Sequence, residues 1–294
     1  MEDKRTHWLI HIFFIFCSTV AILPILMVVG ISFSSEDSII KYGYSLIPRE
    51  FSLGAYNYIF GDPEIIVRAY LITIFSTVVG TLGCLTVTSA LAYPLSRRTL
   101  PLRNFFTFFV VFTILFNGGL VPWYILFKTY LGFSDNVWAL IVPGLMVNGF
   151  NVLIMRTFFS NTIPAELYDS AHIDGAGEIR IFLQIVIPLS KPVYATIGLF
   201  ATLAYWNDWF NSMVFQISPK NYSLQYVLQN ILLNIQYLTV NSNRISVANE
   251  AMATFPAETT RMAMALIAIG PIVFAYPFFQ QYFVKGLTIG AIKG

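Results

Sequence analysis

The sequence predicts an all-α, polytopic membrane protein, because the chain is rich in apolar residues and gathers them into long stretches. Its 294 residues are 56% hydrophobic and 11% charged, whereas a soluble domain carries about 25% charged residues. A helix needs about 20 apolar residues to cross a hydrocarbon core of roughly 30 Å. Six such stretches occupy approximately 8–33, 67–95, 105–127, 137–159, 192–215 and 262–284. We therefore expect residues 1–294 to form a single transmembrane domain of six helices, since lipid leaves backbone groups no other partner.

The first stretch follows Lys4 and Arg5, as a secretory signal would. Its apolar run exceeds the 7–15 residues or so that such signals use, so it is expected to stay as an anchor. Cys17 and Cys84 fall inside predicted spans without metal-type spacing, so they are interpreted as buried apolar residues and no metal site is expected. The net charge of +2 is spread over short loops, and no nucleic-acid partner is expected.

The basic residues of the loops predict an orientation. With a cytoplasmic N-terminus, the cytoplasmic segments are 1–7, 96–104, 160–191 and 285–294, and the outer ones are 34–66, 128–136 and 216–261. Arg97, Arg98 and Arg103 then lie in a cytoplasmic loop that contains no acid. Because short cytoplasmic loops are enriched in Lys and Arg, both termini are predicted to be cytoplasmic.

The loop 160–191 has the pattern of a helix, a turn and a second helix. Asn161 or Thr162 can cap the first helix, Pro164 suits its first turn, Glu166 favours the positive end of the helix dipole, and Gly175 supplies a left-handed stop.

In the second helix of this loop, apolar residues recur at helical spacing and form one stripe. They are Ile179, Phe182, Leu183 and Val186, and Pro188 is expected to end the helix. Gly175, Ala176 and Gly177 leave little side chain at the bend between the two helices, so the backbone of a partner can approach there.

The same loop resembles the cytoplasmic loop of binding-protein-dependent ABC importer permeases. That loop has the form Glu-Ala-Ala, three residues, Gly, nine residues, Ile-x-Leu-Pro. Asp169-Ser170-Ala171, Gly175 and Ile185-Val186-Ile187-Pro188 match it at every spacing. The departures are Asp for Glu, Ser for the first Ala and Ile for Leu, and the shorter acidic side chain reaches less far.

Other segments extend the resemblance to the carbohydrate group of this family. They are 51–58, 92–98, 117–122 and 206–208. The similarity is to the smaller permease subunit of the maltose importer and, closer in style, to oligosaccharide permeases for plant-polysaccharide, uronide or alginate fragments.

This resemblance implies a bacterial plasma-membrane complex that imports a sugar, with an oligosaccharide as the expected class, by alternating access. The implied partners are a second permease, two ATP-binding subunits and an extracytoplasmic solute-binding protein, which is expected to contact the outer segment 216–261. The chain lacks a phosphate-binding Gly-x-x-x-x-Gly-Lys-[Ser/Thr] motif, so ATP and Mg belong to the partners, and neither a cofactor nor a catalytic residue is expected here. The residues expected to couple to the ATPase are Glu166, Asp169, Ser170, Ala171, His172, Asp174, Gly175, Ala176 and Gly177.

Polar and aromatic residues inside the predicted spans are candidates for the sugar pathway. They are Asn117, Asn148, Asn151, Trp206, Asn207, Asp208 and Trp209. A carboxylate at mid-membrane costs roughly 2.5–3.5 kcal/mol, so Asp208 should face protein or water. The alternative is that the Asn and Asp side chains bond neighbouring helices and that the tryptophans anchor the spans at the membrane surface.

Two other classes of protein fit the sequence less well. An ion-coupled secondary transporter usually has repeated halves and charged midplane residues, whereas no internal repeat is evident and Asp208 is the one clear acid in a span. An intramembrane enzyme needs a catalytic constellation, and His7, His11 and His172 are not placed for one.

Overall fold

A computed structural model describes residues 4–144, 147–245 and 256–291, and almost all their regular structure is helical. One isolated β-bridge joins Ser34 and Phe51. The chain divides into two compact units, the first comprising Met1–Ile66 and Val227–Gly270, and the second Val67–Tyr226 and Pro271–Gly294. The predicted all-α class is confirmed.

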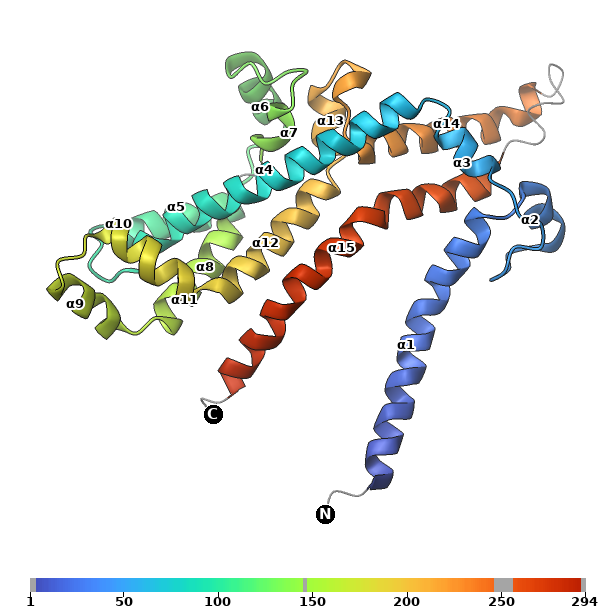
Figure 1. Cartoon of the computed structure of the whole chain (residues 1–294). Coiled ribbons are helices and arrows are strands. Elements are labelled where there is room, and N and C mark those ends of the chain that lie inside the picture. Colours follow the sequence, from blue (N-terminus) through green and yellow to red (C-terminus); the bar gives the residue numbers. More distant parts are fainter. Residues whose placement is uncertain (1–3, 145–146, 246–255, 292–294) are drawn as a thin grey trace. The chain divides into compact units, whose positions relative to one another are not determined.

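The first unit contains α1, α2, α3 and parts of α14 and α15 (Figure 1). Their bounds are Lys4–Ser32, Glu36–Tyr42, Gly54–Ile59, Leu224–Ile245 and Ala257–Ala291. The carboxylate of Glu36 accepts hydrogen bonds from the backbone amides of Glu258 (2.9 Å) and Thr259 (3.0 Å) at the start of α15. A negative charge is favourable at this end of the helix dipole, so Glu36 fixes where α15 begins.

The second unit contains the remaining helices. They are α4 (Pro63–Ser96), α5 (Arg103–Leu115), α6 (Leu120–Tyr124), α7 (Trp138–Ile141), α8 (Gly149–Thr162), α9 (Ala165–Ile173), α10 (Glu178–Ile181), α11 (Ile187–Leu189), α12 (Lys191–Trp206) and α13 (Phe210–Phe215). Two π-helical turns (Ile125–Tyr130 and Phe182–Val186) and one 3-10 turn (Pro219–Asn221) accompany them. Within this unit, α6, α7 and α13 gather near one end of α4, and α9 and α10 lie near the other (Figure 1).

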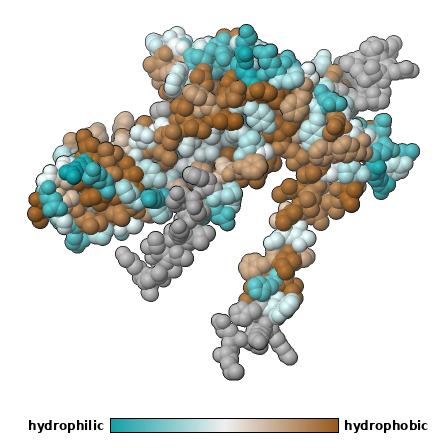
Figure 2. Space-filling view, in the orientation of Figure 1, coloured by the Kyte–Doolittle hydropathy of each residue, from teal (hydrophilic) through white to brown (hydrophobic). Residues whose placement is uncertain are grey.

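Several described helices are long and apolar enough to cross a membrane. Three single helices qualify as candidate spans, over Ile10–Ser32, Pro63–Ser96 and Ala257–Pro277. Two bent pairs also qualify: Arg103–Leu115 with Leu120–Tyr130, bent by 110°, and Glu178–Leu189 with Lys191–Trp206, bent by 81°. The described residues thus provide three spans, or five if each bent pair counts as one. Hydrophobic side chains cover much of the surface of the helices (Figure 2).

Three predicted stretches are not the continuous helices that hydropathy suggests. The stretch 105–127 breaks after α5, where the Asn117 side chain accepts the amide of Gly119, whose φ is +88°. The stretch 137–159 is divided because α7 ends at Ile141 and α8 starts only after Asn148, whose side chain caps it. The stretch 192–215 breaks between α12 and α13. A hydropathy pattern records burial in lipid and carries no signal for these local caps.

The core of the second unit lies where α4, α8, α10 and α12 meet. Ala92, Met155, Ile181 and Ile197 are all completely buried in one cluster. This packing holds the loop between α8 and α12 against the end of α4, so α9 is carried on a rigid base.

Candidate functional site

Helix α9 has one buried and one exposed face. Tyr168 and Ala171 are buried and belong to the core cluster. Ile173, at the end of the helix, is 86% exposed. The exposed predicted coupling residues are Glu166, Asp169, Ser170, His172, Asp174, Gly175 and Gly177, and Ala176 is half-buried. Of the nine, Ala171 therefore supports the helix from beneath, while most of the others face outward.

The start of α9 differs from the expectation. Pro164 is the N-cap residue, and no side chain caps the helix there, so the predicted capping by Asn161 or Thr162 is wrong. The amide of Leu167, which a capping side chain could have bonded, donates instead to the carbonyl of Pro164 at 3.3 Å.

The end of α9 is a Schellman motif, in which two amides beyond the helix bond back into its last turn. The amide of Gly175 donates to the carbonyl of His172 (3.0 Å), and that of Ala176 donates to the carbonyl of Ala171 (2.9 Å). Gly175 has φ +76°, so the predicted left-handed stop is confirmed. A Cβ at Gly175 would meet no described atom within 4 Å, so the need for glycine is conformational.

The segment after the bend buries only part of the predicted apolar stripe, namely Val186 and partly Phe182. Ile179 and Leu183 are 77% and 54% exposed, whereas Ile181 and Val186 are fully buried. The buried pair is five residues apart because Phe182–Val186 is π-helical, and a π turn bonds residue i to i+5. The helical path also continues past the predicted stop at Pro188 to Leu189, and the chain turns at Ser190.

Side chains distant in sequence fix the orientation of α9 and α10. The guanidinium of Arg97 lies 3.7 Å from the centroid of the Tyr168 ring, a cation–π contact. The hydroxyl of Tyr93 donates to Glu178, and Nε2 of His172 is 3.3 Å from Oε1 of Glu178. Burial raises the pKa of the Tyr168 phenol, and the positive charge of Arg97 opposes that rise.

Sequence reasoning missed this group of contacts. In the sequence, Arg97 serves as a marker of orientation, and both Arg97 and Tyr93 lie in the segment 92–98 that resembles the carbohydrate group. Tyr93 and Glu178 are 85 residues apart. The one available signal was a basic residue directly after a predicted span.

The amides among the sugar-pathway candidates are largely bonded locally. The side chain of Asn117 bonds the amide of Gly119, Asn207 donates to the carbonyl of Leu203 (2.9 Å), and Asn148 accepts from the amides of Phe150 and Asn151.

Trp206, Asp208 and Trp209 lie around the break between α12 and α13, and Asn151 lies on α8. The Asp208 carboxylate accepts from the backbone (3.1 Å) and side-chain (2.8 Å) amides of Asn211. Asn151 and Trp206 are buried, whereas Trp209 is 40% exposed and packs edge-on against Phe210. Trp209 thus presents an accessible aromatic face beside a carboxylate that is already hydrogen-bonded.

Other expectations concern metal ions and the outer segment. Over residues 4–144, 147–245 and 256–291, no group of three or more His, Cys, Asp or Glu side chains could hold a metal ion. Much of the segment 216–261 is helix α14, while 246–255 lie outside the described residues.

The chain matches known proteins over nearly its full length. Residues 1–289 match the family model of the binding-protein-dependent transport system inner membrane component. The chain is 36% identical over 294 residues to the polygalacturonan/rhamnogalacturonan transport system permease protein YtcP of Bacillus subtilis (strain 168), with all of both chains covered. It is 38% identical over 275 residues to Protein LplC of the same strain, covering 94% of this chain and 90% of the relative.

A solved structure is also similar. It is the structure of a bacterial ABC transporter involved in the import of the acidic polysaccharide alginate. One chain of that structure is 28% identical in sequence to this chain and superposes on it with a TM-score of 0.78. The match covers 96% of this chain and 97% of that one.

Proposed function

Because the chain belongs to the family of binding-protein-dependent transport system inner membrane components, we propose that it is a permease subunit that passes an oligosaccharide across the membrane. The observation that carries this proposal is the family match over residues 1–289, which leaves almost no part of the chain for another activity. The chain is a membrane component and not the ATP-hydrolysing subunit of its transporter.

The partners follow from this assignment. A binding-protein-dependent importer needs a solute-binding protein outside the membrane, two ATP-binding subunits and a second permease. ATP and Mg are used by the ATP-binding subunits. The outer segment 216–261 is the proposed contact for the solute-binding protein.

The proposed topology has six spans and two cytoplasmic termini. The three single helices and the two bent pairs supply five spans, and α7 with α8 supplies the sixth, between the third and fifth in sequence. The basic segment that contains Arg97, Arg98 and Arg103 supports the orientation, since it follows α4 directly and carries no acid.

Helix α9 is the proposed coupling helix. Its exposed face, which includes Glu166, Asp169 and Ser170, offers polar contacts to an ATP-binding subunit. Ile173 is 86% exposed and stands among these polar groups, as expected for an apolar anchor at an interface. The contacts of the buried Tyr168 with Arg97 and of Glu178 with Tyr93 would transmit its displacement to the end of α4.

The proposed cargo is an oligosaccharide that contains acidic sugars. One relative is named for polygalacturonan and rhamnogalacturonan, and the similar solved transporter imports acidic alginate. Trp209 is the most accessible aromatic candidate for stacking against a sugar ring, with Asn207 beside it for hydroxyl groups.

Uptake of labelled oligogalacturonides and of labelled maltodextrins by cells that express or lack the gene tests this proposal. We expect uptake of the acidic oligosaccharide to require the gene, and the chain to copurify with ATP-binding subunits. Vanadate, which traps ATP-hydrolysing subunits, should block uptake. Transport by the purified chain alone, driven by an ion gradient without nucleotide, would contradict the proposal and favour a secondary transporter.

A further inference from the structure

Four arginines converge at the carboxyl-terminal end of α4. Arg97, Arg98 and Arg103 follow the helix directly, and Arg156 approaches from α8. The Nε groups of Arg103 and Arg156 both donate to the carbonyl of Leu95, at 2.9 Å and 3.1 Å. Within the described part of the chain, none of the four forms an ion pair with a carboxylate. Their other contacts are the Leu95 carbonyl and, for Arg97, the Tyr168 ring, neither of which neutralises their positive charge.

A cavity of about 490 Å³ opens beside this cluster. Its polar and charged lining includes Arg97, Arg98, Arg103, Ser160, Asn161 and Asp169. Three guanidinium groups against one carboxylate give the lining an excess of two positive charges. The Nε of Arg97 is buried and has no hydrogen-bond partner among the described residues. The cavity suits an anion that brings several oxygen acceptors.

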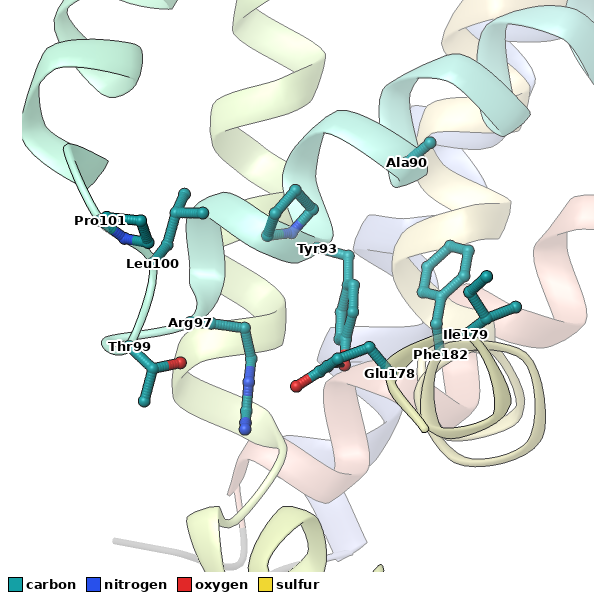
Figure 3. Close-up of a pocket in the computed structure, with 10 residues that line it drawn as sticks. Ala90, Tyr93, Arg97, Thr99, Leu100, Pro101, Glu178, Ile179 and Phe182 are labelled. Atoms are coloured by element: carbon teal, nitrogen blue, oxygen red, sulfur yellow. Dashed lines mark hydrogen bonds between the residues drawn. The ribbon is translucent and has the colours of Figure 1, made fainter. Parts of the chain in front are cut away.

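A second cavity of about 490 Å³ adjoins the first and is mainly apolar (Figure 3). Arg97 and Thr99 line both cavities. The apolar part of the second lining comprises Ala90, Pro94, Leu100, Pro101, Ile179 and Phe182. Glu178 also lines it, but its carboxylate already accepts from Tyr93 and lies beside His172. The two cavities thus place a basic pocket next to an apolar groove, with Arg97 and Thr99 in the lining of both.

This pair of cavities lies at the carboxyl-terminal end of α4. Helix α4 has 34 residues and is therefore about 51 Å long, more than the roughly 30 Å hydrocarbon core. Arg97 and Arg98 follow its last residue, Ser96, and Arg103 begins α5, so the cluster lies at the end of a span, where head groups are expected.

We propose that this site binds an anionic phospholipid, with its phosphate held by Arg97, Arg98 and Arg103 and an acyl chain in the apolar groove. Basic pockets between transmembrane helices are suited to anionic head groups. Neither free phosphate nor an acidic surface of a partner protein would make use of the adjoining groove. The amphipathic lining therefore favours a lipid over those two ligands.

The test is native mass spectrometry of the protein purified from membranes with its partners, titrated with phosphatidylglycerol or phosphatidylcholine. We expect phosphatidylglycerol to bind preferentially. Arg98→Gln should weaken its binding about fivefold, the fold-change for one basic residue near an anionic surface, without disturbing the fold, because Arg98 is exposed. The matched control is Arg180→Gln, which removes a charge from an exposed residue that lines neither cavity and bonds only Gln184.

A second variant separates lipid from phosphate. Ala90 is exposed and lines the apolar cavity but not the basic one. Ala90→Trp should therefore fill the groove and weaken the binding of phosphatidylglycerol while the arginines stay in place. Binding of inorganic phosphate should not change in this variant. Equal binding of both lipids, or equal losses in Arg98→Gln and Arg180→Gln, would overturn the proposal. If the Arg98→Gln complex lost its ATP-binding subunits while its lipid binding stayed unchanged, the arginines would be assigned to a protein partner and the proposal would also be overturned.

Discussion

The phenol ring of Tyr205 on α12 lies directly against the backbone of Gly80 on α4. A Cβ placed on Gly80 would be 2.4 Å from Cζ of Tyr205 and 2.5 Å from its Cε1. The ring is buried, and its hydroxyl donates to the carbonyl of Ile141 at 3.0 Å. Beside it, the hydroxyls of Thr81 and Thr202 are 3.3 Å apart. Small residues thus let two helices approach closely around one aromatic ring, as is common in membrane proteins.

Replacing Gly80 with alanine should destabilise the protein. The new methyl group would overlap the Tyr205 ring, and overpacking of this kind costs about 1–3 kcal/mol. We expect a lower thermal unfolding midpoint in detergent and a lower abundance in membranes. The ring cannot withdraw freely because its hydroxyl is bonded to Ile141.

Gly118→Ala is the matched control, since a Cβ there would meet no described atom within 4 Å. It should leave the unfolding midpoint unchanged. If Gly80→Ala and Gly118→Ala behave alike, the contact with Tyr205 does not constrain the packing of α4 on α12.

The helical class of this protein could be predicted from sequence because lipid leaves the backbone few alternatives. The breaks within the predicted spans could not. Asn148 and Asn117 are candidates for the sugar pathway, and their side chains also accept backbone amides where the chain changes direction. An asparagine in an apolar stretch looks the same in sequence whether it binds a ligand or caps a helix.

Gly175→Val should impair coupling more than it impairs folding. Valine strongly disfavours the φ of +76° found at Gly175, and the Schellman motif that ends α9 depends on it. We expect near-normal abundance in the membrane, with sugar-stimulated ATP hydrolysis by the purified complex reduced severalfold or lost. Gly175→Asn should retain more activity because asparagine tolerates this conformation.

Gly177→Val tests whether conformation is the cause. Gly177 lies in the same bend, but its φ is −74° and a Cβ there would meet no described atom within 4 Å. Stimulated hydrolysis should fall less in this variant than in Gly175→Val, because both variants add a side chain at the bend and only Gly175→Val also strains the backbone. Wild-type stimulation in Gly175→Val would remove the physical basis for a coupling role of the bend.

Glu178→Ala should lower stability, whereas Glu166→Ala should not. Glu178 accepts the hydroxyl of the buried Tyr93, and an unsatisfied buried hydroxyl costs about 1–3 kcal/mol. Because Glu178 itself is exposed, the lower end of that range is expected. Glu166 is exposed on α9, so its loss should reduce association with the ATP-binding subunits instead.

Thermal unfolding and copurification of the two glutamate variants would be measured side by side. Equal effects of both variants on the unfolding midpoint would show that the bond between Tyr93 and Glu178 does not hold α10 against α4.

The loop at Asp135 should lose stability in acid. Its Oδ1 accepts from the amides of Ser218 (2.9 Å) and Ile217 (3.2 Å) and from the side chain of Asn221 (3.1 Å). These bonds lower the pKa of Asp135, with the Ser218 amide as the largest cause. Because the folded pKa is depressed, the stabilisation is complete above the unfolded value of about 3.9 and is lost as pH falls through the folded value.

Asp135→Asn isolates the charge, since asparagine also tolerates the φ of +51° found there. The wild type should unfold a few degrees higher than this variant at about pH 7, and the difference should shrink as pH falls below the ordinary aspartate pKa of about 3.9. A difference that does not change with pH would mean that the ionised carboxylate does not hold this loop.

The contacts beneath α9 mark the limit of sequence reasoning about the site. The left-handed stop at Gly175 follows from local backbone chemistry, and it was predicted correctly. The stack of Arg97 on Tyr168 joins residues whose proximity depends on how α4, α8 and α9 pack, and no local pattern encodes that packing. The π turn at Phe182–Val186 escaped prediction for a related reason, because it changes which residues face the core without changing their identity.

The corner of 81° at Ser190 has a mechanical consequence. Helices α10 and α11 meet α12 almost at a right angle. A force applied along the axis of α10 would therefore act perpendicular to the axis of α12 and tend to rotate α12 about Ser190. A straight helix would convert the same force into sliding along its own axis. If α10 moves, the stiffness of the chain at Ser190 would therefore determine how far α12 rotates.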